Sequence, residues 1–247
     1  NALFGLEYKR YENQHAEIYT AENSDRAFEE EVMLSGFANA QVKAEGAGVS
    51  FDEAQETFTA RYTHETVALA FAITEEAIED NLYDRLASRY TKALARSMSN
   101  AKQVKSVEPL INGLPSTATF NTGDGVSLFN ASHPTIAGTF ANTLAVQADL
   151  NETSLEQSMI DIAKMTDERG LKVAARGVKM IVPSENQFNA ERLMKSAGRT
   201  GTADNDINAI ASMGMVPQGY RVNNFLTDAD SFYIITDVPN GMKYFNR

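Results

Sequence analysis

The alternation of hydrophobic and polar positions predicts extended structure in the second quarter of the chain. Residues 57–63 and 67–73 both alternate with a period of two, as half-buried strands do. The preceding stretch, 36–51, is rich in small residues, and 44–48 is a suitable tip. We therefore predict a long β-hairpin, the extended loop, over residues 36–73. Because a two-stranded ribbon is marginal in water, it should lie on something else, and a neighbouring subunit is one candidate.

The pattern becomes helical after Thr74, which can cap a short turn. A long helix is predicted over about 82–107, where apolar residues recur at spacings of three and four. The apolar stripe consists of Leu82, Leu86, Tyr90, Leu94, Met98 and Ala101, and the other side carries Arg85, Arg89, Lys92 and Arg96. Such a helix would be roughly 38 Å long, which is unusual for a domain of this size. Pro109, Gly113 and Pro115 are expected to end it.

The N-terminal 35 residues are polar and charged, which predicts an extended arm with a short helix near 27–34. Three consecutive glutamates at 29–31 are interpreted as a solvated face of this arm. The chain begins without Met, which we interpret as a processed or partial chain. Its start has neither a basic region nor an apolar stretch, so no signal peptide is expected.

The second half of the chain predicts a mixture of short elements. Residues 116–150 are rich in Gly, Ser, Thr and Asn, which favours turns and short strands. A helix then starts near 153–154, where Ser154 and Gln157 fit a capping box, and Gly170 can end it. Further periodic segments are a strand at 178–182, a helix at 185–196, and strands at 220–223, 231–237 and 242–245. This order of helices and strands predicts an α+β fold.

The composition of the chain limits the classes of function that it can have. The formal net charge of −11 and a pI near 4.8 argue against a duplex-binding surface, which needs Lys and Arg to displace counterions. The absence of cysteine excludes disulfides, thiolate zinc sites and cysteine nucleophiles. No run approaches the roughly 18 apolar residues that a membrane span requires, so no membrane partner is predicted.

Candidate chemistry is sparse. The three histidines, His15, His64 and His133, are far apart in sequence and never paired at metal-ligand spacing. His133 precedes a proline and is expected in a turn, and His64 is expected to face solvent. No Gly-x-Ser-x-Gly elbow or phosphate loop occurs. We predict no catalytic, metal or cofactor site. The alternative from another class is a cofactor-independent hydrolase, which would need Asp and Glu carboxylates to converge near His133.

Two local motifs resemble a known family. Phe-Thr-Ala-Arg-Tyr-Thr at 58–63, followed by Phe-Ala-Ile-Thr-Glu-Glu-Ala-Ile-Glu-Asp at 71–80, is similar to the passage from extended loop to spine helix in Mu-like major head subunits. Asp-Gly-Val-Ser-Leu-Phe-Asn-Ala-Ser-His-Pro at 124–134 resembles a second segment of the same group. The chain thus resembles major capsid proteins of tailed bacteriophages, with the Hong Kong ninety-seven type shell fold.

The resemblance implies a division of the chain into four parts. These are an N-terminal arm (1–35), the extended loop (36–73), a peripheral domain with the spine helix (74–115), and the remaining peripheral elements with an axial domain (116–247). In this fold the chain returns from the axial domain to complete the sheet beside the spine helix. Because this sequence stops soon after 242–245, we expect a C-terminal segment to be missing and one sheet edge to be open.

The resemblance also implies a structural function without catalysis. The subunit would form hexamers and pentamers of an icosahedral shell around double-stranded DNA, which it would not bind specifically, with cement, portal and scaffold proteins as possible partners. It would assemble in the bacterial cytoplasm and reside in the virion. The expected inter-subunit contacts are Lys43, Glu45, Gly46, Gly48 and Phe51 at the loop tip, and Phe4, Tyr8 and Tyr11 in the arm. Alternatives are an encapsulin-type nanocompartment shell and a phage tail or head-decoration protein.

Overall fold

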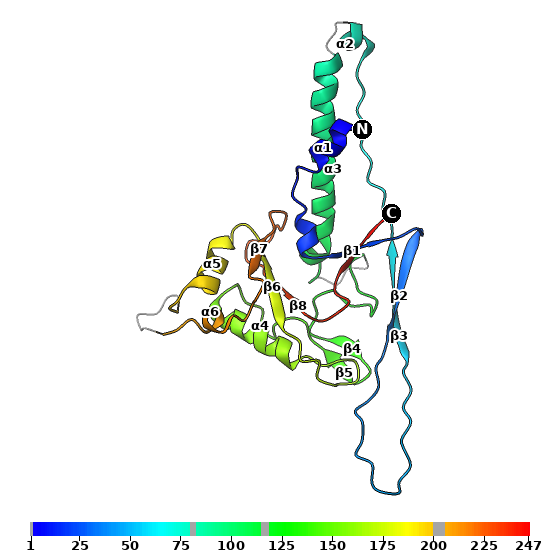
Figure 1. The fold of residues 1–247 in the computed structure, drawn as a ribbon, viewed down its shortest axis with the longest axis vertical. Helices are drawn as coiled ribbons and strands as arrows, with labels where there is room; N and C mark the ends of the chain where they lie inside the picture. Colours follow the sequence, from blue (N-terminus) through cyan, green and yellow to red (C-terminus); the bar gives the residue numbers. More distant parts are fainter. Residues whose placement is uncertain (1, 80–82, 115–118, 200–205) are drawn as a thin grey trace.

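The fold consists of a mixed α/β body from which a long helix and a hairpin project in opposite directions (Figure 1). The computed structural model describes residues 2–79, 83–114, 119–199 and 206–247. The mixture of helices and short strands confirms the predicted α+β class. None of the helices within these ranges is long and apolar enough to cross a membrane.

The projecting hairpin pairs β2 (Phe28–Leu34) with β3 (Glu56–Thr63) in antiparallel register. The expected short helix at 27–34 is therefore wrong. Those residues pair across the ribbon, where the Arg61 guanidinium lies 4.4 Å from the ring centre of Phe28, and such cross-strand contacts override local helix propensity. The segment 67–73, predicted as a strand of the same hairpin, lies outside it and belongs to no sheet of the described residues. The hairpin thus spans 28–63.

The long helix predicted from the sequence is present as α3 (Tyr83–Ile111), preceded by the short α2 (Glu75–Glu79). Its 29 residues correspond to roughly 43 Å. Pro109 lies inside the helix and does not end it, because a proline in the last turn removes only one backbone hydrogen bond. Leu82 of the expected apolar stripe lies outside the described residues, Leu86, Leu94, Met98 and Ala101 are half-buried, and Tyr90 is 42% exposed. The buried residues of the helix are Ala95, Ser99, Gln103, Ser106, Val107 and Leu110.

The core of the body lies on both faces of a three-stranded sheet in the order β7-β6-β8. Strand β6 (Gly177–Val182) is central, parallel to β7 (Tyr220–Val222) and antiparallel to β8 (Tyr233–Thr236). One face packs in a cluster with α4 (Glu152–Lys164), α5 (Gln187–Lys195) and α6 (Ala209–Met213). The other face meets the end of α3 in a second cluster: Val107, Leu110, Ile181 and Leu226.

The start of α4 differs in detail from the prediction. Asn151 is the N-cap, and it forms a reciprocal capping box with Ser154, the third residue of the helix. Gln157 instead donates to Asp161 within the helix. The helix ends at Lys164, and Gly170 sits in a separate turn with a φ of 82°. An Asn side chain can accept a hydrogen bond from the amide of the third helical residue, as a Ser side chain can. The local sequence therefore allows a helix that is capped by Asn151 or by Ser154.

Both ends of the chain return to α3. The N-terminal segment forms α1 (Ala2–Tyr8), a 3-10 turn (Gln14–Glu17) and β1 (Thr20–Asn23). The last strand, β9 (Lys243–Asn246), pairs in parallel with β1. Lys102 of α3 lies 4.8 Å from the ring centre of Tyr244 in that strand. A small hairpin, β4 (His133–Thr135) and β5 (Gly138–Phe140), lies beside β3.

Candidate assembly surfaces

The tip of the β2–β3 hairpin is the most exposed apolar surface of the chain. Residues 36–56 contact little of their own chain, and Phe51 is 98% exposed. The predicted tip residues Lys43, Glu45, Gly46 and Gly48 are all exposed as well. The sequence-based set omitted three exposed apolar residues of the same loop: Phe37, Val42 and Val49. Large apolar side chains that are fully solvated at a projecting tip indicate a contact made outside the chain.

The base of this loop is held closed by backbone and side-chain hydrogen bonds. The amide of Ser35 donates to the Gln55 carbonyl at 2.8 Å, and the amide of Gln55 donates to the Ser35 hydroxyl at 2.9 Å. Asp52 accepts a hydrogen bond from the amide of Ala38 at 2.7 Å across the loop. That hydrogen bond, with help from the amide of Glu53 and the charge of Arg169, lowers the pKa of Asp52.

Arg169 fixes the loop base to the body. Its Nε donates to the Gly36 carbonyl at 3.2 Å and its Nη2 donates to the Glu53 carbonyl at 2.7 Å, so one guanidinium holds both arms of the loop. The turn that carries Arg169 is itself ordered by Asp167, whose Oδ1 accepts from the amides of Arg169 (3.0 Å) and Leu171 (2.8 Å). We call this arrangement the Arg169 latch. The sequence analysis did not predict the Arg169 latch. The local signal at this position is an Asp-x-x-Gly pattern, which is typical of a turn.

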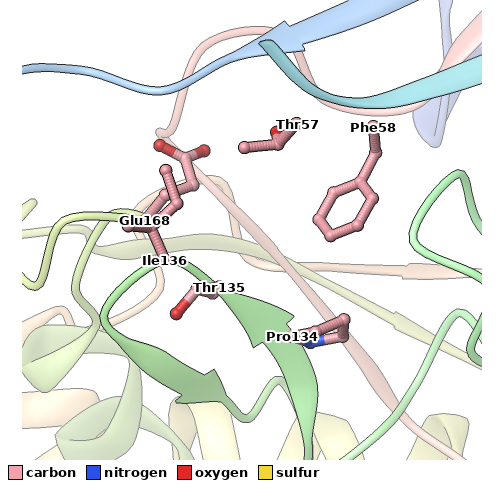
Figure 2. Close-up of a pocket in the computed structure, with 6 residues that line it drawn as sticks. All are labelled: Thr57, Phe58, Pro134, Thr135, Ile136 and Glu168. Carbon is pink, nitrogen blue, oxygen red and sulfur yellow. The ribbon is translucent and has the colours of Figure 1, made fainter. Parts of the chain in front are cut away.

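Beside the latch lies a shallow, largely apolar cleft of about 240 Å³ between β3 and the β4–β5 hairpin. Figure 2 shows Phe58 directed across it toward Pro134, with the Glu168 carboxylate at one end near Thr57. The cleft contains no cluster of convergent polar groups. Among the described residues, no group of three or more His, Cys, Asp or Glu side chains is arranged to hold a metal ion.

His133 pairs with a carboxylate, but as part of the packing of a loop. Its Nδ1 lies 2.6 Å from Asp124 Oδ2, and both side chains are 12% exposed. Burial raises the pKa of Asp124, but hydrogen bonds from Thr122, His133 and the Val126 amide outweigh it, and the net shift is downward. The Nε2 of His133 is buried and has no hydrogen-bond partner among the described residues. The expectation of a turn at His133 is wrong, because the residue lies in β4.

The other two histidines hold the N-terminal segment in place. His64, expected in solvent, is half-buried with Nε2 2.9 Å from the Ser24 hydroxyl. The amide of buried His15 donates to Gln103 Oε1 at 3.1 Å, and Gln103 Nε2 donates to the Glu12 carbonyl at 3.2 Å. Burial, followed by the charge of a nearby lysine, lowers the pKa of His15.

The N-terminal segment is attached to its own chain for most of its length. Helix α1 packs against α3, where Phe4 stacks on Tyr8 at 5.8 Å, and both residues are half-buried, as is Tyr11. Further along, Tyr19 donates to the Ser106 carbonyl at 2.6 Å, and burial raises its pKa. The part of this segment from α1 to β1 therefore lies against its own chain, and the assignment of residues 1–35 as an arm stays a prediction. The role of the three aromatic residues between subunits stays a prediction.

The three consecutive glutamates are only partly solvated, and each has a polar or charged partner. Glu29 accepts a hydrogen bond from the Ser24 hydroxyl at 2.6 Å, and Glu30 pairs with Arg61 on β3 at 2.6 Å. Glu31 pairs with Lys243 of β9. The run thus connects the hairpin to the two segments that lie beside it. Arg61 and Lys243 are far from the glutamates in sequence, which is why a charge pattern alone suggested solvation.

Comparison with known proteins identifies the class to which this architecture belongs. A family model described as phage capsid protein matches residues 56–246, which is most of the chain. The chain therefore belongs to the phage capsid protein family. It is a structural protein of the virion capsid and not an enzyme, and the hydrolase alternative is set aside. A search of curated proteins finds no match.

Solved structures show the same fold at low sequence identity. The capsid protein of bacteriophage JBD30, in a capsid decorated with minor capsid protein trimers, superposes with a TM-score of 0.64 at 12% identity over 88% of this chain and 92% of that one. The subunit in the procapsid of the same phage gives a TM-score of 0.55 at 12% identity, covering 91% of this chain and 97% of that one. At this identity the likeness concerns the fold.

Proposed function

We propose that this chain is the major capsid protein of a tailed bacteriophage, with the Hong Kong ninety-seven type shell fold and a Mu-like head subunit pattern. Copies would form hexamers and pentamers that tile an icosahedral head around double-stranded DNA, assembled in the bacterial cytoplasm. The family match and the similarity to JBD30 capsid and procapsid subunits support this proposal. The proposed partners besides copies of the chain are cement, portal and scaffold proteins. Minor capsid protein trimers decorate the JBD30 capsid, which supports a partner of the cement kind.

The single observation that carries the proposal is the projecting hairpin with its exposed apolar tip. Phe51 at the loop tip is 98% exposed, so its own chain does not stabilise it by burial. We infer that this apolar surface is buried against another molecule. The loop base, in contrast, is tightly held by the Arg169 latch. A fixed base with an apolar tip suits an element that reaches over an adjacent subunit in one defined direction.

The charge of the chain suits a container for DNA. With a formal net charge of −11, the subunit attracts phosphates only weakly, and DNA packaged inside such a shell would move past the wall without sticking. Shell stability would then come from many modest protein interfaces, each with an apolar centre and a polar rim.

The proposal is tested by removing the apolar character of the loop tip. A chain with Val42→Ser, Val49→Ser and Phe51→Ser should fold, because these residues are 71–101% exposed, but should remain unassembled. The matched control changes Ile207, Met213 and Phe188, which are 68–71% exposed elsewhere on the body, to Ser. Light scattering after size-exclusion chromatography measures the outcome. Shells that form normally with the polar tip would contradict the role given to the loop.

A further inference from the structure

The segment between β3 and α2 is a strand without a strand partner. Residues 67–73 alternate large apolar side chains with alanine, yet within the described part of the chain no backbone hydrogen bond involves residues 65–73. Val67, Leu69 and Phe71 are 46%, 55% and 43% exposed. Figure 1 shows this segment running between β3 and α2 alongside α3. An apolar, extended segment with free amides and carbonyls is a template for pairing with another strand.

The segment is held in place on one side only. Phe71 makes an edge contact with Tyr90 of α3 at 5.6 Å between ring centres, and Glu65 forms an ion pair with Lys105 of α3 at 3.5 Å. These two contacts hold the strand against the helix near both of its ends. They leave its backbone groups unused, so pairing with another strand would cost the subunit no internal hydrogen bond.

We propose that residues 66–72 pair with the same residues of a second copy of this chain, antiparallel about a two-fold axis at Leu69. The inference rests on the proposed function in one respect: a shell built from copies of one subunit supplies a second copy to every such segment. In this register Val67 lies opposite Phe71 and Ala68 opposite Ala70 of the partner copy. Large residues then share one face of the ribbon and alanines share the other.

Charge disfavours two alternative pairings. The segment is uncharged from 66 to 74 and is flanked by Glu65 and Glu75. A parallel pairing in register would place Glu65 opposite Glu65, and an antiparallel pairing centred on Ala70 would place Glu65 opposite Glu75. Like charges directly opposite each other destabilise a strand pair. Centring on Leu69 places Glu65 opposite Ile73 and avoids both conflicts.

The proposal predicts a sharp pattern of disulfide cross-links, which is easy to measure because the chain has no cysteine. Directly opposite residues of an antiparallel pair are about 4.5–5.5 Å apart and diagonal ones about 7–8 Å, whereas a disulfide needs Cα atoms within roughly 4.4–6.8 Å. Leu69→Cys should therefore form a cross-linked dimer as the main species on a non-reducing gel. Ala68→Cys, Ala70→Cys and Ala72→Cys should each show only background cross-linking.

A second measurement does not depend on the Leu69 variant. Co-expressed Ala68→Cys and Ala70→Cys chains, distinguished by a tag, should cross-link to each other although neither does so alone. Circular dichroism checks that each variant is folded. Cross-linked dimers between residues 68 and 70 support the pairing, whether or not particles form. If particles assemble but neither Leu69→Cys nor the mixed pair cross-links, the pairing is overturned and the shell function stands. If dimers cross-link but no particle ever forms, the pairing stands and the shell function fails.

Discussion

The Arg169 latch gives a prediction whose size can be worked out from the structure. Arg169→Ala removes two hydrogen bonds, to the carbonyls of Gly36 and Glu53, from the base of the loop. A typical hydrogen bond contributes about 0.5–1.5 kcal/mol net, and these lie at the surface, where solvent weakens charged contacts. We therefore expect opening of the loop base to become easier by about 1–2 kcal/mol, which corresponds to an opening equilibrium about 5–30-fold larger.

Hydrogen exchange measures this opening directly. The amides of Ser35 and Gln55 are bonded across the loop base, and in Arg169→Ala they should exchange about 5–30-fold faster. The melting temperature should change little, because few other contacts depend on the loop. The control is Arg26→Ala, since Arg26 is 79% exposed and makes only a 4.0 Å ion pair. Unchanged exchange at Ser35 and Gln55, or the same acceleration in the control, would refute the latch.

Three further predictions concern the body of the subunit. Leu155→Ala, at a fully buried position of α4, should lower the free energy of unfolding in urea by about 2–5 kcal/mol. Ile160→Ala, at a position 46% exposed on the same helix, should lower it far less, and equal losses would contradict the assigned core. Gly113→Ala would place a methyl group 2.6 Å from a ring carbon of Phe129, and it should cost about 1–3 kcal/mol by the same assay; wild-type stability would show that the site is open. Asp124 has a folded-state pKa below its ordinary 3.8, so it contributes stability above that pH that is lost as the pH falls through the folded pKa. Asp124→Asn should remove this acid-dependent part from melting curves recorded at decreasing pH, and an unaltered pH dependence would contradict an ionised, hydrogen-bonded Asp124.

Elements that depend on local periodicity were predictable from the sequence. The 3.6-residue pattern indicated α3, α4 and α5, and the apolar run of β6 indicated a buried strand. These segments bury a face that their own sequence defines, so local pattern and tertiary structure agree. The projecting hairpin was also predicted, although the predicted limits lie closer to the C-terminus than the observed ones.

Features that depend on distant partners were not predictable. Residues 28–34 have a glutamate run that favours helix or solvent, and only pairing with β3 and with Lys243 makes them a strand. The latch joins Arg169 to Gly36 across 133 residues, and a single arginine in a turn gives no sign of such a partner. The opposite case is 67–73, whose strand pattern is clear while no strand of the described residues pairs with it. There the sequence pattern agrees with a partner outside the chain.

The most direct test of the central claim is the size of the particle that the purified chain forms. Size-exclusion chromatography with light scattering, followed by negative-stain imaging of the largest species, measures it. The account predicts closed shells or rings of capsomers. A monomer near the chain mass of 27.1 kDa that stays monomeric at high concentration, even when made with any adjoining residues of the natural protein, would contradict it.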